Sequence, residues 1–176
     1  MRTLASIALP TLVLAGSLRA QTAYVPATEL PNGREIVVVY IGASTCGPCK
    51  SPPVKEAVQR MKTLLAAQAK EHGAAFSVVG VSTDWGVAEG AAFLEPNGPF
   101  DQIVVGGNWA NLGVEQYLWR DNKRRPVEPQ ILVFERTVKQ GDRMTFSDLR
   151  LLRQVTAGKD IPEWVRAGAP IWDKKP

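Results

Sequence analysis

The chain contains few of the side chains that build metal centres: two cysteines and a single histidine among 176 residues. Structural zinc sites take four ligands, and Cys46 and Cys49 supply only two. His72 follows a predicted helix that starts beside the cysteines, so roughly 20 residues and about 30 Å of helix separate it from them. The sequence therefore predicts no metal site, and nothing in it indicates an organic cofactor.

Low-complexity tracts, internal repeats and arginine-rich stripes are also lacking. Without repeats or biased segments, neither a solenoid nor a disordered chain is favoured. Hydrophobic residues make up 45% of the sequence, which is ordinary for one globular domain of this length. The missing basic stripe with interleaved aromatic residues argues against nucleic-acid binding. Composition thus predicts a single compact domain, which we expect to be a monomer.

No apolar run is long enough to span a bilayer, which takes about 17 to 25 residues. The longest, residues 4–17, follows Arg2 and is soon followed by the small residue Ala20. This pattern is typical of a cleaved signal peptide over residues 1–20. We therefore expect a periplasmic or secreted protein that contacts a membrane only if this segment stays uncleaved. In such a compartment disulfides persist.

Periodicity along the rest of the chain alternates between strands and helices. After an extended leading segment at residues 21–34, residues 36–41 form an apolar run typical of a central strand that is covered on both faces. Helical spacing follows from Val54 to near Gly73, with Lys62 on the polar side. The further expected elements are a strand at 76–81, a helix at 88–94, a strand at 102–105, a helix at 112–119, a strand at 130–135, a hairpin through 139–146 and a last helix after Ser147 or Asp148 that buries Leu149, Leu152 and Val155. This order predicts an α/β fold.

Cys46 and Cys49 admit three interpretations. A structural disulfide closing so short a loop would restrain little of the unfolded chain's entropy, and a metal site lacks ligands. A working dithiol fits better, because the strand-to-helix junction places the Cys46 sulfur at a helix N-terminus, where free NH groups favour a thiolate. Cys49, one turn later, can attack a mixed disulfide formed at Cys46. Gly47 permits the tight bend, and Pro48 occupies a first-turn position that needs no NH donor.

Four segments in order, VVVYI, CGPCK, VVGVSTD and VEPQILVF, resemble the thioredoxin-fold proteins. The resemblance is narrower to the exported members related to TlpA, ResA and the cytochrome c maturation thioredoxins, and it covers roughly residues 34–158. It implies a thioredoxin-like domain at residues 35–158, with a central mixed β-sheet flanked by helices on both faces. An extra helical and strand insertion would lie between the second core strand and the cis-proline strand, and residues 159–176 would form a C-terminal extension.

In this family a cis proline packs against the dithiol, and its neighbouring backbone receives the partner's chain. The resemblance therefore implies that the Glu128–Pro129 bond is cis and that Cys46 and Cys49 are catalytic. It also implies substrate-positioning roles for Pro129, Glu128 and Thr45. Thr45 stands where related proteins carry a tryptophan, so an aromatic wall of the partner groove is missing.

Two further departures from the family concern proton transfer and the start of the helix. Tyr40 and Gly80 occupy the positions where thioredoxins bury an aspartate and its lysine companion. The proton acceptor for Cys49 is therefore unassigned. Pro52 and Pro53 are expected to bend or loosen the helix start, because each lacks an NH group and crowds the preceding turn.

The leading hypothesis is an exported thiol–disulfide oxidoreductase, of the reducing kind by resemblance to thioredoxin, that exchanges disulfides with proteins and with an electron-exchange partner. The alternative is a thioredoxin-like interaction domain with little redox turnover, which the missing tryptophan and the missing buried acid favour. A peroxiredoxin would need threonine or serine where Ala43 stands, and a copper chaperone of the Sco kind would need a wider cysteine spacing. Lys123, Arg124 and Arg125 either border the dithiol or form a solvated loop, and the sequence does not set the direction of electron flow.

Overall fold

The computed structural model describes residues 23–120 and 125–172, and the predicted signal peptide lies outside them. The strands in these residues, which form one mixed sheet, are β1 (Gly33–Gly42), β2 (Ala75–Ser82), β3 (Gln102–Val104), β4 (Gln130–Lys139), β5 (Thr145–Phe146) and β6 (Arg150–Thr156). The helices are α1 (Pro52–Glu71), α2 (Val87–Leu94), α3 (Leu112–Val114) and α4 (Asp160–Arg166), with 3-10 turns η1 (Pro48–Lys50), η2 (Glu95–Asn97) and η3 (Asn108–Ala110) and the π turn η4 (Glu115–Trp119). No helix in this part of the chain is long and apolar enough to cross a bilayer.

β1 lies inside the sheet because its residues 36–41 are apolar on both faces, and each is at most 1% exposed. It pairs in parallel with β2 and antiparallel with β4, while β3 extends the sheet in parallel beyond β2. β4 also pairs antiparallel with β5 and β6. Parallel pairing brings the carboxyl ends of β1 and β2 to one edge of the sheet, and the antiparallel β4 starts at that edge. The loops that follow β1 and β2 and the segment that precedes β4 therefore meet there.

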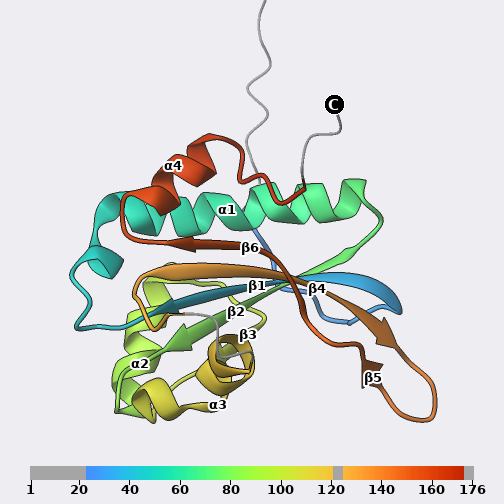
Figure 1. Cartoon of the computed structure of the whole chain (residues 1–176), viewed down its shortest axis with the longest axis horizontal. Helices are drawn as coiled ribbons and strands as arrows, with labels where there is room; N and C mark the ends of the chain where they lie inside the picture. The colour runs from blue at the N-terminus through green and yellow to red at the C-terminus, as the bar shows by residue number, and fades with distance from the viewer. Residues whose placement is uncertain (1–22, 121–124, 173–176) are drawn as a thin grey trace, which may run out of the picture.

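Helices cover both faces of the sheet, as predicted (Figure 1). α1 and α4 lie together on one face, and α3 with η4 lies on the other. α2 packs against β2 and directs Phe93 and Leu94 into the same core as α1. Because side chains alternate along β1, its residues divide between the two cores. Ile36, Val38 and Tyr40 face α1, and Val37, Val39 and Ile41 face α3.

The connections between these elements define a known topology. β1–α1–β2 gives two parallel strands joined by a helix, and β4–β6–α4 adds two antiparallel strands and a closing helix. This is the thioredoxin fold, so the predicted fold class is confirmed. Residues 83–129 between the two halves carry α2, β3 and α3, which is the expected insertion. Ile161, Trp164 and Val165 of α4 pack in the core of α1, so the segment that we set apart as a C-terminal extension shares the core of the domain.

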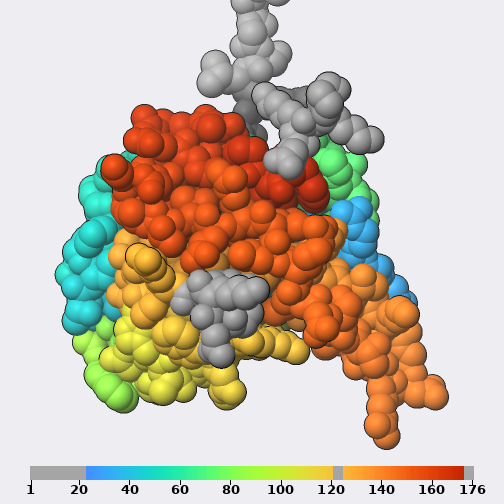
Figure 2. All heavy atoms as spheres, viewed as in Figure 1, coloured from blue at the N-terminus to red at the C-terminus, as the bar shows by residue number. Residues whose placement is uncertain are grey.

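The predicted last helix, with Leu149, Leu152 and Val155 buried, is wrong: residues 150–156 form β6. A bulge in the pairing of β6 with β4 leaves Leu152 without an opposite residue. It sends Leu149 and Leu151 to the α3 core, and Leu152 and Val155 to the α1 core. Because of the bulge, Leu149, Leu152 and Val155 recur at the spacing of a helix although the segment is extended. The turn between β4 and β5 protrudes from the body of the molecule (Figure 2).

Lys62, which the helical pattern placed on the polar side of α1, is instead fully buried. Its ammonium group donates a hydrogen bond to the Asn97 carbonyl oxygen and lies 4.4 Å from the centroid of the Phe100 ring. Burial lowers the pKa of Lys62 to about 8, and the nearby Asp101 opposes this shift. The insertion covers this part of α1, which the sequence pattern of the helix alone does not indicate.

Candidate active site

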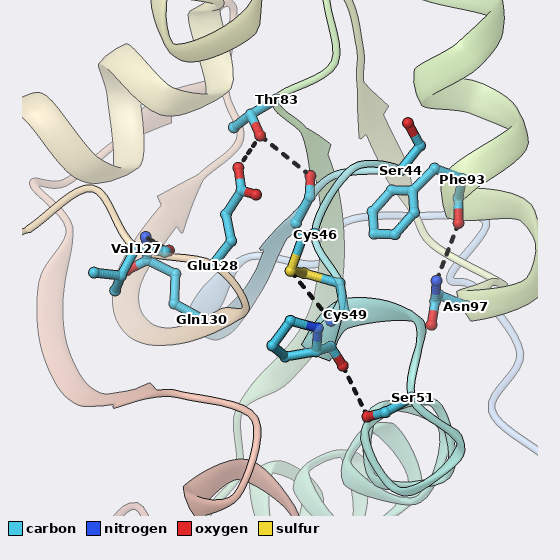
Figure 3. Close-up of a disulfide and its surroundings, with 12 residues drawn as sticks. Ser44, Cys46, Cys49, Ser51, Thr83, Phe93, Asn97, Val127, Glu128 and Gln130 are labelled. Carbon is cyan, nitrogen blue, oxygen red and sulfur yellow. Dashed lines mark hydrogen bonds between the residues drawn. A yellow bond between two sulfur atoms is a disulfide. The ribbon is translucent and has the colours of Figure 1, made fainter.

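The loop after β1 carries both cysteines, and they form a disulfide (Figure 3). The S–S distance is 1.98 Å, and the two Cα atoms lie 5.3 Å apart. Cys46 is partly exposed, whereas Cys49 is fully buried in the core of α1. The burial follows the order predicted for an accessible attacking sulfur and a shielded resolving sulfur.

A short turn separates the cysteines from the long helix. η1 begins at Pro48, Ser51 is extended with φ −66° and ψ 139°, and α1 begins only at Pro52. The helical path is therefore interrupted at Ser51, directly before the two prolines that are expected to bend or loosen the helix start. Cys46 precedes this separate turn, which corrects the prediction that it stands at the N-terminus of the long helix. Its Sγ accepts a hydrogen bond from the Cys49 NH at 3.1 Å, so a local NH group is the donor that favours negative charge on this sulfur.

The Asp84 carboxylate connects the loop before Cys46 to the end of β2. It accepts hydrogen bonds from the Ser44 NH at 3.0 and 3.1 Å, from the Ser44 hydroxyl at 2.7 Å and from the Ser82 hydroxyl at 2.6 Å. Burial raises the pKa of Asp84, but the hydrogen bonds from Ser82 and Ser44 outweigh burial and hold the pKa below its usual value. Asp84 is 4% exposed and positions the dithiol loop, whereas the adjacent Trp85 is 75% exposed.

Glu128 lies beside the disulfide although it comes from a distant part of the chain (Figure 3). One of its carboxylate oxygens and the two cysteine Sγ atoms all lie within 4.8 Å of one another. The Thr83 hydroxyl donates a hydrogen bond to Glu128 Oε1. Burial raises the pKa of Glu128, the hydrogen bond from Thr83 opposes this, and the negative charge of Asp84 raises the pKa further. Among the described residues no cation forms an ion pair with Glu128.

The Glu128–Pro129 peptide bond is cis, as the resemblance implied. Pro129 is buried, and its carbonyl oxygen accepts a hydrogen bond from the Ala157 NH at 3.2 Å, just past the end of β6. A Cβ atom added to Gly158 would lie 2.9 Å from Pro48 Cβ. The loop after β6 therefore packs closely against both the cis-proline segment and the turn that carries the dithiol.

Tyr40 lies under the dithiol, at the position where thioredoxins bury an aspartate. Its side chain is fully buried, and its hydroxyl has no hydrogen-bond partner among the described residues. A Cβ atom added to Gly42 would lie 3.1 Å from this hydroxyl and 3.2 Å from Cys49 Sγ, so both groups face the same small space beside Gly42. Burial raises the pKa of Tyr40, and the charge of Glu128 raises it further, so the hydroxyl keeps its proton. The ring of Phe93 stacks 6.3 Å from that of Tyr40 and closes this side.

The remaining predicted residues lie around the rim of the site. Thr45, Gly47 and Pro48 are exposed, so they border the side on which Cys46 is accessible. Arg125 is exposed as well, and Lys123 and Arg124 lie outside the described residues. The positioning roles of these residues stay predictions.

Cys46, Cys49 and Glu128 are also the kind of group that could hold a metal ion. In the disulfide neither sulfur is a thiolate, and the thiolate is the form that ligates metals. His72 caps the C-terminus of α1, at the far end of the helix from the cysteines, and stacks on Trp172 at 3.9 Å. The described residues therefore bring no fourth side chain of the usual zinc-binding types to the cysteines.

Comparison with known proteins assigns the chain to no family. No family model matches the chain, and no curated protein matches it. Among solved structures, one match is described as "Structure of MTB dsbF in its mixed oxidized and reduced forms". It is 17% identical, covers 76% of this chain and 81% of that chain, and has a TM-score of 0.35. The fold assignment rests on the strand order and the connections between the strands.

Three features of the site have roles that the sequence does not assign, although Thr83 and Asp84 stand at the end of the segment VVGVSTD. Glu128 was expected to position substrate because it precedes Pro129, but its closeness to both sulfurs follows from where β4 starts. Thr83 and Asp84, at the end of β2, hold Glu128 and the dithiol loop. Tyr40 gave a signal only as a departure from the family pattern.

Proposed function

We propose that this protein is a thiol–disulfide oxidoreductase that exchanges disulfides with other proteins through Cys46 and Cys49. The observation that supports this most strongly is the pair itself, in which a partly exposed sulfur is joined to a fully buried one at the edge of the sheet where three loops meet. A disulfide that is accessible at one sulfur is open to attack by an incoming thiolate. The reduced pair can in turn attack the disulfide of a partner.

In the reducing direction the reaction takes two exchange steps. The Cys46 thiolate attacks one sulfur of a partner disulfide, so that a mixed disulfide forms and the first partner thiolate leaves. The Cys49 sulfur, after losing its proton, attacks Cys46 Sγ and displaces the second partner thiolate. The partner gains two electrons, the Cys49 proton and a proton from water bring its two thiolates to thiols, and the chain ends in the disulfide state.

The segment at Glu128 and Pro129 is proposed to position the partner. An extended partner chain can pair with this backbone in the manner of an added strand, which brings its disulfide to Cys46. Exposed Thr45 borders the same side of the site and offers a small polar surface in place of an aromatic wall. These contacts would speed the reduction of a protein disulfide, and a small-molecule disulfide cannot make them.

We further propose that the enzyme is exported and acts as a reductase, as in the TlpA and ResA relatives that its segments resemble. The apolar run at residues 4–17 supports export, and the glycine and proline between the cysteines support the reducing direction. Intact-mass measurement on protein from its native host tests the first point, because export by a cleaved signal peptide removes about the first 20 residues. Retention of Met1 in a membrane fraction would make the segment an anchor instead.

An insulin-reduction assay tests the proposed activity. The purified protein should catalyse reduction of insulin by a dithiol reductant, and Cys46→Ser should abolish catalysis. The specific argument for the alternative, an interaction domain with little turnover, is the exposed Thr45 at the place of the tryptophan. Equal rates for the parent and for Cys46→Ser would support that alternative and contradict the oxidoreductase.

A further inference from the structure

Cys49 needs an internal group to take its proton. The resolving step of the proposed function requires the Cys49 thiolate, because the thiol itself is a poor nucleophile. Cys49 is fully buried, so bulk water does not reach its sulfur in this structure. Thioredoxins bury an aspartate below this sulfur, and this chain has Tyr40 there, which keeps its own proton. The acceptor must come from another element.

Glu128 is the carboxyl group at the right place. Its oxygen lies within 4.8 Å of both sulfurs, a gap that one water molecule or a small side-chain rotation can bridge. The Thr83 hydroxyl occupies Oε1 and fixes the side chain, which leaves the second oxygen free of hydrogen bonds from the described residues. Thr83 is itself held to the end of β1 through its NH, which donates to the Gly42 carbonyl oxygen at 3.0 Å. The carboxyl group is thereby fixed in register with the dithiol loop.

We propose that Glu128 is the proton acceptor of the dithiol, taking the Cys49 proton during resolution, and that the Tyr40 hydroxyl donates a hydrogen bond to the thiolate that results. This inference rests on the proposed oxidoreductase function and gives Glu128 a role beyond positioning the partner. It also gives the Tyr40 hydroxyl, which has no hydrogen-bond partner among the described residues, a partner in the reduced protein.

The charges around the site favour transfer of a proton from Cys49 to Glu128. Among the described residues, the groups that face the Glu128 carboxyl group are Thr83 and Asp84 from the end of β2, Tyr40 from β1 and the two cysteines. A carboxylate and a thiolate so close together would repel each other, so the pair holds one negative charge at lower cost than two. Moving the proton from Cys49 to Glu128 keeps the charge of the site constant. The thiolate is created without adding charge to a buried place.

The step balances as follows. The S–H bond of Cys49 breaks and an O–H bond forms on Glu128. The electron pair left on Cys49 sulfur forms the bond to Cys46 Sγ, and the bond between Cys46 and the partner sulfur breaks. The partner leaves as a thiolate and takes the proton from Glu128, which returns to the carboxylate. The chain is oxidised to its disulfide and the partner is reduced to a thiol.

The pKa values agree with this role. An acceptor works best when its pKa approaches the working pH. Burial and Asp84 both move the pKa of Glu128 in that direction, while Thr83 holds it back. Glu128 must be ionised to accept a proton, so resolution should fail as the pH falls through its pKa.

Rapid-quench trapping of the mixed disulfide tests the proposal. Reduced full-length protein is mixed with a disulfide-bonded protein substrate, thiols are blocked at intervals, and the Cys46 mixed disulfide is quantified by mass spectrometry. Glu128→Gln keeps an oxygen for Thr83 but cannot take a proton, and we expect it to slow resolution by about 10²-fold and to accumulate the mixed disulfide. Glu89→Gln is the matched control, because Glu89 is exposed near Ser44 and no step uses it. It should resolve as the parent does.

Cys49→Ser separates the possible failures. If this variant traps a mixed disulfide but Glu128→Gln resolves at the parent rate, the role of Glu128 is wrong and the oxidoreductase stands. If Cys49→Ser traps nothing and the parent reduces nothing, the proposed function itself is wrong.

Thr83→Val gives a second test that does not depend on the folding of Glu128→Gln. It removes the hydrogen bond that lowers the pKa of Glu128 and leaves the carboxyl group in place. The resolution rate falls in acid as Glu128 becomes protonated. In Thr83→Val this acidic limb of the pH profile should therefore lie at higher pH than in the parent. An unchanged limb, or one that moves to lower pH, would overturn the assignment.

Discussion

Two glutamates lie at opposite ends of the paired strands β1 and β4, and they have different partners. Glu35, at the start of β1, is fully buried and accepts hydrogen bonds from Arg136 Nε at 2.6 Å and from the Ser77 hydroxyl at 2.5 Å. Glu128, just before β4, accepts a hydrogen bond from the neutral Thr83 hydroxyl and has the negative Asp84 nearby. One carboxyl group therefore has a cation, and the other has none among the described residues.

The difference separates a carboxylate that stabilises the fold from one that is available to accept a proton. An ion pair compensates the charge of Glu35, and removing one partner of a buried pair is strongly destabilising. Burial and the nearby negative charge of Asp84 instead raise the pKa of Glu128, and the described residues provide no cation to oppose this, so proton uptake is favoured. At one end of the sheet the ion pair of Glu35 stabilises the fold. At the other end, Glu128 is placed to accept the proton of Cys49.

The largest effect expected from this comparison is on folding stability. Glu35→Gln should lower the free energy of unfolding by about 3 to 5 kcal/mol, because it leaves Arg136 partly buried without its anion. Glu128→Gln should leave it unchanged or raise it at neutral pH. The reason is that a carboxyl group whose pKa is raised in the folded state costs stability once it is ionised.

Denaturant unfolding of the two variants beside the parent measures this contrast. Equal losses in both variants would show that the two glutamates play the same structural part.

A smaller effect is expected at Asp84, which lies near Glu128 but has its pKa lowered. Asp84→Asn should cost about 2 kcal/mol, since hydrogen bonds to a charged group are replaced by neutral ones. Its stabilising contribution is present above the ordinary pKa of 3.8 and is lost as the pH falls through the lower folded value. The parent should therefore lose stability in acid more steeply than the variant does.

Asp148→Asn is the control for this measurement, because the Asp148 side chain is 96% exposed and should change little. Acid unfolding followed by circular dichroism reports both variants. Identical acid curves for Asp84→Asn and the parent would contradict the assignment.

The smallest effect is expected at Tyr40. Tyr40→Phe removes a hydroxyl that has no hydrogen-bond partner among the described residues and that we infer donates a hydrogen bond to the Cys49 thiolate after reduction. The disulfide form should be favoured by about 1 kcal/mol, which lowers the reduction potential by roughly 20 mV. Equilibration with glutathione measures this shift. Tyr24→Phe serves as the control, because its hydroxyl bonds to Asp101 away from the cysteines, and a potential in Tyr40→Phe no lower than that of the parent would sink the Tyr40 assignment.

Much of the fold could be predicted because its signals are local. The buried run of β1, the helical spacing after Val54 and the motif around the cysteines each lie within a short stretch of sequence. The bulge at Leu152 could not be predicted, because it depends on how β6 pairs with β4. Lys62 was misplaced for a similar reason, since the insertion that buries it is distant in sequence.

The candidate site divides in the same way. Cys46, Cys49 and the cis bond before Pro129 follow from motifs whose order along the chain resembles a family. The proton chemistry of Glu128 depends on the antiparallel pairing of β1 with β4, which brings the start of one strand to the end of the other. From the sequence, Tyr40 is recognisable only as a departure from the family pattern. That its hydroxyl has no hydrogen-bond partner among the described residues and lies near Cys49 depends on the packing around Gly42.

Titration of Cys49 in the reduced state tests the coupling between Glu128 and the dithiol most directly. In a Cys46→Ser background, Cys49 is the remaining thiol, and its ionisation can be followed by thiolate absorbance as the pH is raised. Adding Glu128→Gln removes a neighbouring negative charge, so the apparent pKa of Cys49 should fall. An apparent pKa that is unchanged or higher with Glu128→Gln would show that the two groups do not share a proton, and the account of this end of the sheet would be wrong.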